Sequence, residues 1–277
     1  MITLKDKVIV ITGASDGIGE QAARKLHLMG ATVVIVGRSE NKTKTIASEL
    51  NSKYYLADFA ILEEVRDLAA KLKKDYPRID VLVNNAGGIF GKRELTVDGH
   101  EKTMQVNYLA PFLLTNLLMD ILISSQASVI NTSSIGNKIL SKFNIDDIEL
   151  MKNYNPRVAY GNAKLENILF TKELNKRFHS KGVSTAAFHP GNVATNFANN
   201  TTDLLKYVYH TPLRKLFLIS AEKGADTLVW LASTSPDKDW VSGEYYYRRK
   251  ISNKVSPDAL NESYAKKLWN QSEEFIR

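Results

Sequence analysis

Short apolar runs alternate with longer amphipathic stretches along most of the chain. The short runs are rich in Val, Ile and Leu and nearly continuous, as in parallel strands that are buried on both faces. They predict strands at 8–12, 32–36, 54–57, 81–84, 128–132 and 184–188. The stretches between them have a helical period and predict helices near 18–29, 41–50, 61–75, 99–123 and 157–180.

This alternation predicts an α/β fold built from right-handed βαβ crossovers. We expect one Rossmann-type domain over residues 1–277, with a doubly wound parallel sheet of about seven strands and helices on both faces. Two segments, 138–155 and 196–220, look inserted near the edge of the sheet where ligands bind. The second is rich in Leu, Tyr and Phe, which fits either an apolar lid over a substrate or a surface helix packed on the core.

Composition narrows the class of protein. The chain has 277 residues, 44% of them apolar, and no run long enough to span a membrane. It has no cysteine and no signal-peptide pattern, so we expect a cytoplasmic protein without disulfides or thiolate metal sites. The five histidines lack metal-ligand spacing, and no metal is expected. The net charge of +7 is spread along the chain, which indicates a basic surface that favours anionic ligands rather than a nucleic-acid or membrane interface.

A glycine-rich turn directly follows the first predicted strand. Gly13, Gly17 and Gly19 have the spacing Gly-x-x-x-Gly-x-Gly, and an amphipathic helix comes next. Glycines allow the backbone to approach a pyrophosphate closely, and the helix N-terminus presents N–H groups to it. The turn therefore predicts dinucleotide binding, although glycines after a strand can also form a simple turn.

The end of the second predicted strand bears on the choice of dinucleotide. An NAD site usually has Asp or Glu about 20 residues after the glycines. Arg38 stands in this region instead, and a guanidinium suits a ribose 2′-phosphate. We predict NADP(H), with NAD(H) as the alternative; the carboxylate of Asp16 counts against a phosphate nearby.

Tyr160 and Lys164 are four residues apart in a predicted helix and so lie on one face of it. A fixed ammonium stabilises a phenolate, so this tyrosine can exchange a proton with a substrate oxygen near neutral pH. The pair alone also fits an ordinary exposed helix edge. Further polar residues follow three predicted strands, in the segments 84–87, 132–134 and 189–195, and Asn107 lies in the helix predicted at 99–123.

Together, in this order, these motifs resemble the short-chain dehydrogenase/reductase family over essentially the whole chain. The resemblance implies a catalytic tetrad of Asn107, Ser134, Tyr160 and Lys164. It implies that Ser134 holds the substrate oxygen and that Lys164 also binds the nicotinamide ribose. Ser133 remains the alternative to Ser134, because adjacent strand residues point to opposite faces. The cofactor contacts that it implies are Gly13, Ser15, Gly17, Ile18, Gly19, Arg38, Asp58, Asn85, Ala86, Gly87, Tyr160, Lys164, Pro190, Gly191, Val193 and Thr195.

The segments 98–101, 105–110, 164–170 and 268–274 resemble the retinol-dehydrogenase-like branch of this family. Membrane-anchored members of the branch carry an N-terminal apolar segment that this sequence lacks, so we expect a soluble member and do not carry over retinoid substrates.

The expected function is NADP(H)-dependent interconversion of a carbonyl and an alcohol on a small, hydrophobic substrate, with Tyr160 as acid and base. One alternative is a catalytically silent NADP-binding regulator or scaffold. Another is a nucleotide-sugar epimerase or dehydratase, although few residues remain after Thr195 for a sugar-binding domain. The resemblance also implies a homodimer or homotetramer formed through two long helices, one of which carries Tyr160.

Overall fold

A single mixed sheet runs through the centre of the computed structural model, which describes residues 3–191 and 219–277. The strand order is β3-β2-β1-β4-β5-β6-β7-β8, and the first seven strands are parallel. The short β8 pairs with β7 in the antiparallel direction. The strands are β1 (Val8–Thr12), β2 (Thr32–Gly37), β3 (Tyr54–Leu56), β4 (Val81–Asn84), β5 (Ser128–Thr132), β6 (Ser184–His189), β7 (Glu244–Tyr247) and β8 (Lys250–Ile251).

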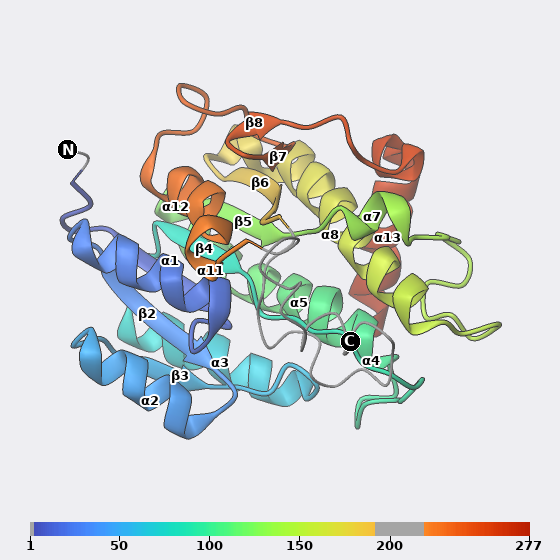
Figure 1. Cartoon of the computed structure of the whole chain (residues 1–277), viewed down its shortest axis with the longest axis horizontal. Helices are drawn as coiled ribbons and strands as arrows, with labels where there is room; N and C mark the ends of the chain where they lie inside the picture. The colour runs from blue at the N-terminus through green and yellow to red at the C-terminus, as the bar shows by residue number, and fades with distance from the viewer. Residues whose placement is uncertain (1–2, 192–218) are drawn as a thin grey trace.

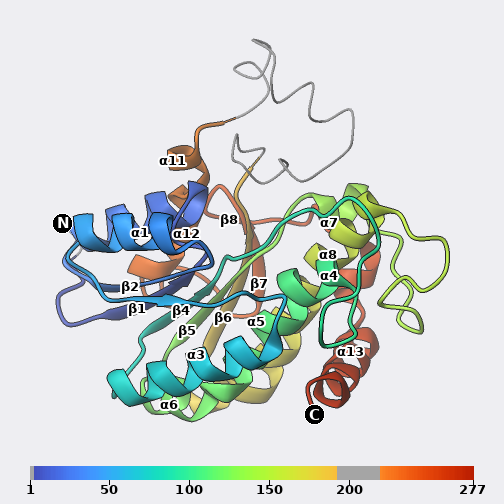
Figure 2. The same cartoon turned by 90° about the horizontal axis from the view of Figure 1, so that it is seen from below.

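Helices cover both faces of this sheet (Figures 1 and 2). One face is covered by α1 (Gly17–Leu28), α2 (Glu40–Glu49), α11 (Ala221–Gly224) and α12 (Asp226–Ser233). The other face is covered by α3 (Leu62–Asp75), α5 (Ala110–Leu117), α6 (Met119–Ser124), α8 (Pro156–Phe178) and α13 (Glu262–Phe275). Because apolar side chains leave both faces of the strands, two separate hydrophobic cores result, and the α/β doubly wound fold is confirmed.

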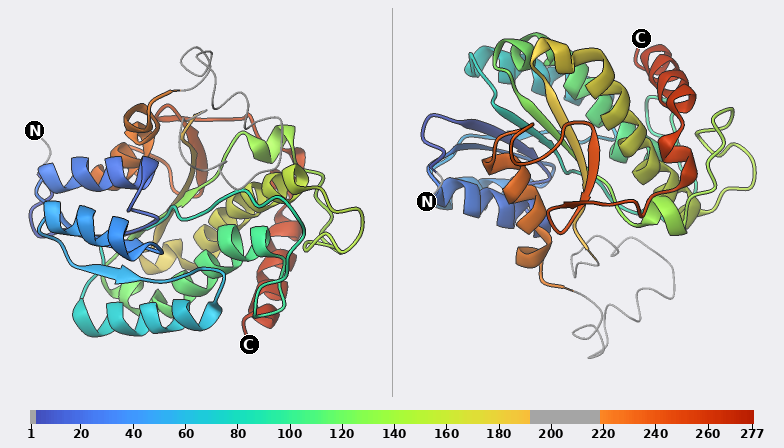
Figure 3. Two further views of the ribbon diagram at one scale, coloured as in Figure 1. Left: turned by 60° about the horizontal axis from the view of Figure 1, so that its bottom comes forward. Right: turned by 90° about the horizontal axis from the view of Figure 1, so that it is seen from above.

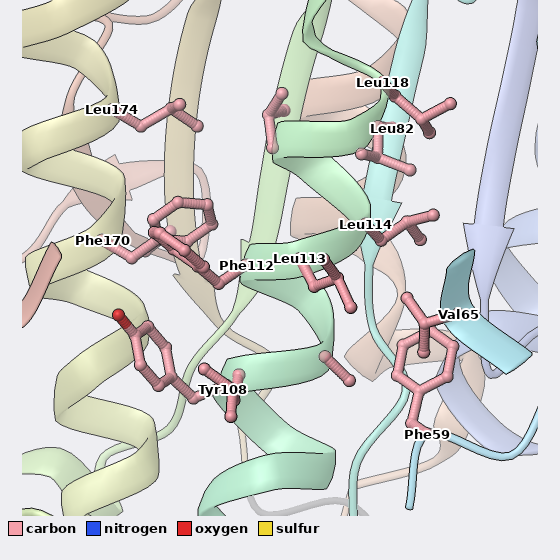
Figure 4. Packing of buried hydrophobic residues seen from close by; sticks show 14 of the residues in the cluster. Phe59, Val65, Leu82, Tyr108, Phe112, Leu113, Leu114, Leu118, Phe170 and Leu174 are labelled. Atoms are coloured by element: carbon pink, nitrogen blue, oxygen red, sulfur yellow. The ribbon is translucent and has the colours of Figure 1, made fainter. Parts of the chain in front are cut away.

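The larger core lies under α5 and α8. Figure 4 shows Phe112 of α5 facing Phe170 of α8, and their ring centroids are 5.4 Å apart. Trp269 of α13 packs on both rings at 5.0 and 5.8 Å. Figure 3 shows α13 lying along α8, on the side of the molecule away from α1 and α2. The C-terminal helix therefore covers the outer surface that α5 and α8 share.

The predicted strands match the observed ones within one residue at each end, but two strands were missed. The single helix predicted at 99–123 is wrong. Gly99 has φ +85, which a helix excludes, and the chain becomes helical only at α4 (Lys102–Met104), where the Glu101 carboxylate accepts from the Thr103 and Met104 amides. A π-helical turn over Gln105–Leu109 follows, and Leu118 separates α5 from α6.

The inserted segment 138–155 begins in the short helix α7 (Gly136–Ile139) and ends at Asn155, which caps α8. The second inserted segment, 196–220, for which a lid and a surface helix were the alternatives, lies outside the described residues except for its last two positions. Short 3₁₀ turns at His179–Lys181 and Pro257–Leu260 complete the described chain. None of the helices described is both long and apolar enough to cross a membrane.

Candidate active site

The turn after β1 and the turn after β4 are tied together by hydrogen bonds. The Thr12 hydroxyl accepts from the amides of Asn85 and Ala86, each at 3.0 Å, and the Asn85 side-chain amide donates to the Thr12 carbonyl at 3.0 Å. Gly13 has φ +65, and a Cβ there would lie 2.9 Å from the Ala86 Cα. Only glycine fits this position. These two turns meet where the strand order reverses, which is where such sheets bind dinucleotides.

Helix α1 begins at this turn without a side-chain cap from Asp16. The first-turn amides of a helix have no partner within it, so Gly17, Ile18 and Gly19 can present theirs to a phosphate. The Asp16 carboxylate lies 2.7 Å from the Lys42 ammonium of α2. The negative charge that counted against a nearby phosphate is thus compensated by a cation that the sequence did not single out.

Arg38 and Asp58 lie close together at the ends of β2 and β3. The Arg38 guanidinium is 3.8 Å from the Asp58 carboxylate, and its side chain is 62% exposed. The other Asp58 oxygen accepts from the Ala60 amide at 3.0 Å. Ser15 is near as well, because a Cβ at Gly37 would lie 2.8 Å from its hydroxyl. Three of the predicted cofactor contacts, Ser15, Arg38 and Asp58, therefore gather at one edge of the glycine turn.

Tyr160 and Lys164 lie one turn apart on α8, and both are buried, with 8% and 2% exposure. The Lys164 Nζ lies 5.5 Å from the centroid of the Tyr160 ring. Among the described residues, the Thr132 carbonyl is its one hydrogen-bond acceptor, at 3.2 Å. Burial lowers the pKa of Lys164 from 10.5 to about 7. This ammonium has donors to spare for ligand hydroxyl groups, so the position fits a ribose.

The two candidate serines differ in what their hydroxyls do. The Ser133 side chain is 1% exposed, and its hydroxyl donates to the Lys164 carbonyl at 2.6 Å. Ser134 is half-buried, and its oxygen accepts from the Gly136 amide at 3.1 Å. The Ser133 proton is therefore committed to the backbone, whereas the Ser134 proton remains available to a substrate.

Asn107 uses its side chain to hold the loop after β4. Its amide nitrogen donates to the carbonyls of Gly88 and Thr103, at 2.9 and 2.8 Å, and its oxygen accepts from the Gly88 amide at 3.1 Å. Its own carbonyl accepts from Asn167 of α8 at 3.0 Å, inside the π-helical turn. Such turns frequently mark functional sites. Asn107 thereby connects α8 to the loop that carries Gly87.

Two glycines show how closely the four residues approach. A Cβ at Gly87 would lie 2.4 Å from the Asn107 Oδ1 and 3.3 Å from the Lys164 Nζ. A Cβ at Gly136 would lie 3.2 Å from the Tyr160 ring and 3.5 Å from the Ser134 hydroxyl oxygen. The structure therefore brings the predicted tetrad together at the C-terminal edge of the sheet.

The segment after β6 is described only in part. Gly191 has φ +93, and its amide donates to the His189 ring at 3.3 Å, next to Pro190. The other two cofactor contacts predicted in this segment, Val193 and Thr195, lie outside the described residues.

Tyr245 is a neighbour of Tyr160 that the sequence did not single out. It lies on β7, which was not predicted, and its hydroxyl accepts from the Asn137 side chain at 3.4 Å. Burial and, after it, the nearby Tyr160 raise the pKa of Tyr245 above its ordinary value. Because this position follows from strand pairing, no local motif points to it.

Comparison with known proteins agrees with this geometry. The profile of the short chain dehydrogenases matches residues 7–205. A Streptomyces protein named as a daunorubicin C-13 ketoreductase is 37% identical over 97% of this chain and 92% of its own length. Human retinol dehydrogenase 12 is 36% identical over 99% of this chain and 88% of its own length.

Solved structures show the same fold. An uncharacterized protein from Mycobacterium paratuberculosis has a TM-score of 0.78 and 29% identity, over 99% of this chain and 94% of its own. A short chain dehydrogenase from Escherichia coli CFT073, complexed with NADPH, has a TM-score of 0.67 and 26% identity, over 88% of this chain and 97% of its own. The chain belongs to the short-chain dehydrogenase/reductase family, in its retinol-dehydrogenase-like branch. It is an oxidoreductase of the class that interconverts carbonyls and alcohols with a nicotinamide dinucleotide.

Proposed function

We propose that the chain is an NADP(H)-dependent carbonyl reductase or alcohol dehydrogenase in which Tyr160 exchanges the proton. The observation that carries this proposal is the convergence of Tyr160, Ser134 and Lys164 around Gly136 and Gly87. A protein that only binds the dinucleotide needs the glycine turn, but it has no need for a buried lysine beside a tyrosine and an uncommitted serine. This argues against the silent regulator or scaffold.

Each side chain has a distinct part in reduction. The Tyr160 phenol donates its proton to the carbonyl oxygen, and the Ser134 hydroxyl donates a hydrogen bond to the same oxygen, where negative charge develops. The Lys164 ammonium stabilises the resulting phenolate and binds ribose hydroxyls with the donors that Thr132 does not use. When bound, the nicotinamide supplies the hydride.

Asn107 is a positioning residue in this proposal. Its side-chain hydrogen bonds to Gly88 and Thr103 hold the loop beside Lys164. Its backbone carbonyl accepts from Asn167 and can accept a second bond, with which it would hold a water that links Lys164 to solvent. That water would return a proton to Tyr160 after each turnover.

We propose NADP(H) over NAD(H), with Arg38 as the cation that would bind the 2′-phosphate and Lys42 as the cation that offsets the nearby charge of Asp16. Arg38 is largely exposed at the end of β2, and Lys42 lies on α2, across from the glycine turn. The related structure with NADPH supports this choice. Arg38→Asp should weaken NADPH binding at least tenfold more than NADH binding. An equal loss of affinity for NADPH and NADH would contradict the preference for NADP(H).

The experiment that tests the function is oxidation of NADPH with a panel of aldehydes, ketones and quinones, repeated with Ser134→Ala and Ser133→Ala. We expect turnover with at least one apolar carbonyl compound, a loss of about a hundredfold in Ser134→Ala, and much less in Ser133→Ala. NADPH binding without turnover on any compound would favour the scaffold. Turnover of a nucleotide sugar instead would favour the epimerase or dehydratase.

The oligomeric state implied by the resemblance stays a prediction. Trp269 of α13 is 3% exposed and covers Phe112 of α5 and Phe170 of α8. We therefore propose that a homodimer or homotetramer of this chain uses a surface other than that of α5 and α8.

A further inference from the structure

A small cavity lies beside the candidate active site, at the C-terminal ends of β5, β6 and β7. Its volume is about 210 Å³, below the roughly 300–1,000 Å³ that is typical of sites for drug-sized ligands. It therefore suits one end of a small molecule. Its lining residues are Ile135, His189, Tyr245, Tyr247, Ser252 and Lys254.

The cavity adjoins the candidate active site. Ile135, which lines it, directly follows Ser134. Tyr245, which also lines it, is bonded to Asn137 of α7, the short helix whose first residue, Gly136, lies against Tyr160. The cavity therefore lies on the side of Tyr160 and Ser134 where Ile135 and Tyr245 stand, in the direction that a bound substrate would take from these two residues.

The inner wall is aromatic and neutral. The rings of His189 and Tyr247 stack with centroids 5.0 Å apart and an interplanar angle of 24°. Burial lowers the pKa of His189 to about 4, and its Nδ1 accepts from the Gly191 amide, so the ring carries no charge near neutral pH. Flat apolar groups pack well against such rings.

The rim is cationic. Lys254 lines the cavity and is exposed, and no carboxylate of the described residues lies within 4.0 Å of its ammonium. The Arg248 guanidinium lies 5.0 Å from the centroid of the Tyr247 ring and is likewise without a carboxylate partner in the described part of the chain. Arg249, its neighbour, is instead paired with Asp226. No acidic side chain is among the lining residues that the structure describes, so the rim attracts anions.

We propose that this cavity receives the distal end of the substrate and that the substrate is an aromatic carbonyl compound bearing a carboxylate, which Lys254 binds. The inference rests on the proposed function, because it places the reacting carbonyl at Tyr160. Lys254 would thus determine specificity without taking part in the reaction.

The test compares two ketones as substrates for NADPH oxidation, 4-acetylbenzoate and its methyl ester, which lacks the negative charge and carries one more methyl group. We expect wild-type kcat/KM to be about tenfold higher for the acid, which corresponds to about 1.4 kcal/mol. Lys254→Met should remove this preference by lowering kcat/KM for the acid while leaving the ester within about twofold. Lys250→Met is the matched control, because this exposed lysine on β8 does not line the cavity. It should change neither value.

The possible outcomes distinguish a failure of the carboxylate subsite from a failure of the proposed reductase function. If Lys254→Met affects acid and ester equally, or neither, the carboxylate subsite is wrong and the reductase stands. The same holds if wild type reduces other carbonyl compounds but neither ketone. If wild type reduces no carbonyl compound at all, function and subsite fail together.

Discussion

Replacing Lys164 by methionine should make the cofactor-free protein more stable while it removes activity. The ammonium is 2% exposed, lies beside the Tyr160 ring and has the Thr132 carbonyl as its one hydrogen-bond acceptor among the described residues. Methionine fills a similar volume without a charge. Stability and function are therefore opposed at this position, as expected for a group that is retained for chemistry.

The magnitude follows from the pKa of Lys164. Burial lowers it from 10.5 to about 7, and at about 1.36 kcal/mol per pH unit this difference sets an upper limit of about 5 kcal/mol. Local relaxation and the lost hydrogen bond to Thr132 reduce the gain. We expect Lys164→Met to raise the free energy of unfolding by about 2–3 kcal/mol at pH 7.

The pH dependence distinguishes this cause from better packing. Below pH 7 the lysine is charged in both states, and the full cost is present. Between pH 7 and 10.5 the unfolded chain holds a proton that the folded protein has released, so wild-type stability rises with pH. This release lowers the advantage of Lys164→Met by about 3 kcal/mol between pH 7 and 9.5, so the advantage should be close to zero at pH 9.5.

Urea denaturation of both proteins at pH 7 and pH 9.5, without cofactor, measures this advantage. Lys266→Met, which changes an exposed lysine on α13, is the control and should show no such pH dependence. A Lys164→Met protein that is less stable than wild type at pH 7, or whose advantage does not vary with pH, would refute the reasoning.

Three further changes have defined outcomes. Glu166→Leu should stabilise the fold by about 1–3 kcal/mol in thermal or urea denaturation, because neither oxygen of this fully buried carboxyl has a hydrogen-bond partner in the described residues. The control Glu173→Leu breaks the ion pair with Arg177 and should destabilise the fold instead. The Glu149 carboxylate, 3.0 Å from the His100 ring, raises the pKa of that ring. The stability that His100→Gln removes, about 1.5 kcal/mol, should therefore be present below about pH 6.5 and fade as the pH rises. A loss that is constant from pH 5.5 to 9 would contradict this. Gly87→Ala should lower kcat about tenfold with an unchanged circular dichroism spectrum, because the alanine Cβ would collide with the side-chain oxygen of Asn107. Wild-type turnover in this variant would show that the position of this loop does not affect catalysis.

The sequence predicted β1, β2, β4 and β5 well because these strands are mostly buried runs rich in β-branched residues. The bounds of β1, β4 and β5 agree with the prediction at both ends. The β7–β8 hairpin was missed because its turn contains Arg248 and Arg249, with φ 51 and 60, where glycine or asparagine would have signalled it.

The candidate site was predictable where it follows a motif and not where it depends on packing. The glycine turn and the Tyr160 helix each occupy a few consecutive residues with a recognisable spacing. The pairing of Asp16 with Lys42, and the position of Tyr245 next to Tyr160, arise only when distant elements meet in the fold. The resemblance favours Ser134 over Ser133, and the physical difference between their hydroxyls needed the structure, because it depends on which of them donates to the Lys164 carbonyl.

The central claim is that Tyr160 transfers the proton during carbonyl reduction. Turnover of the preferred ketone by Tyr160→Phe, with NADPH affinity measured on the same protein, tests it most directly. We predict that kcat falls at least a thousandfold while the Kd for NADPH changes less than threefold, because only the phenolic proton has been removed. Turnover within tenfold of wild type, with normal NADPH binding, would contradict the claim.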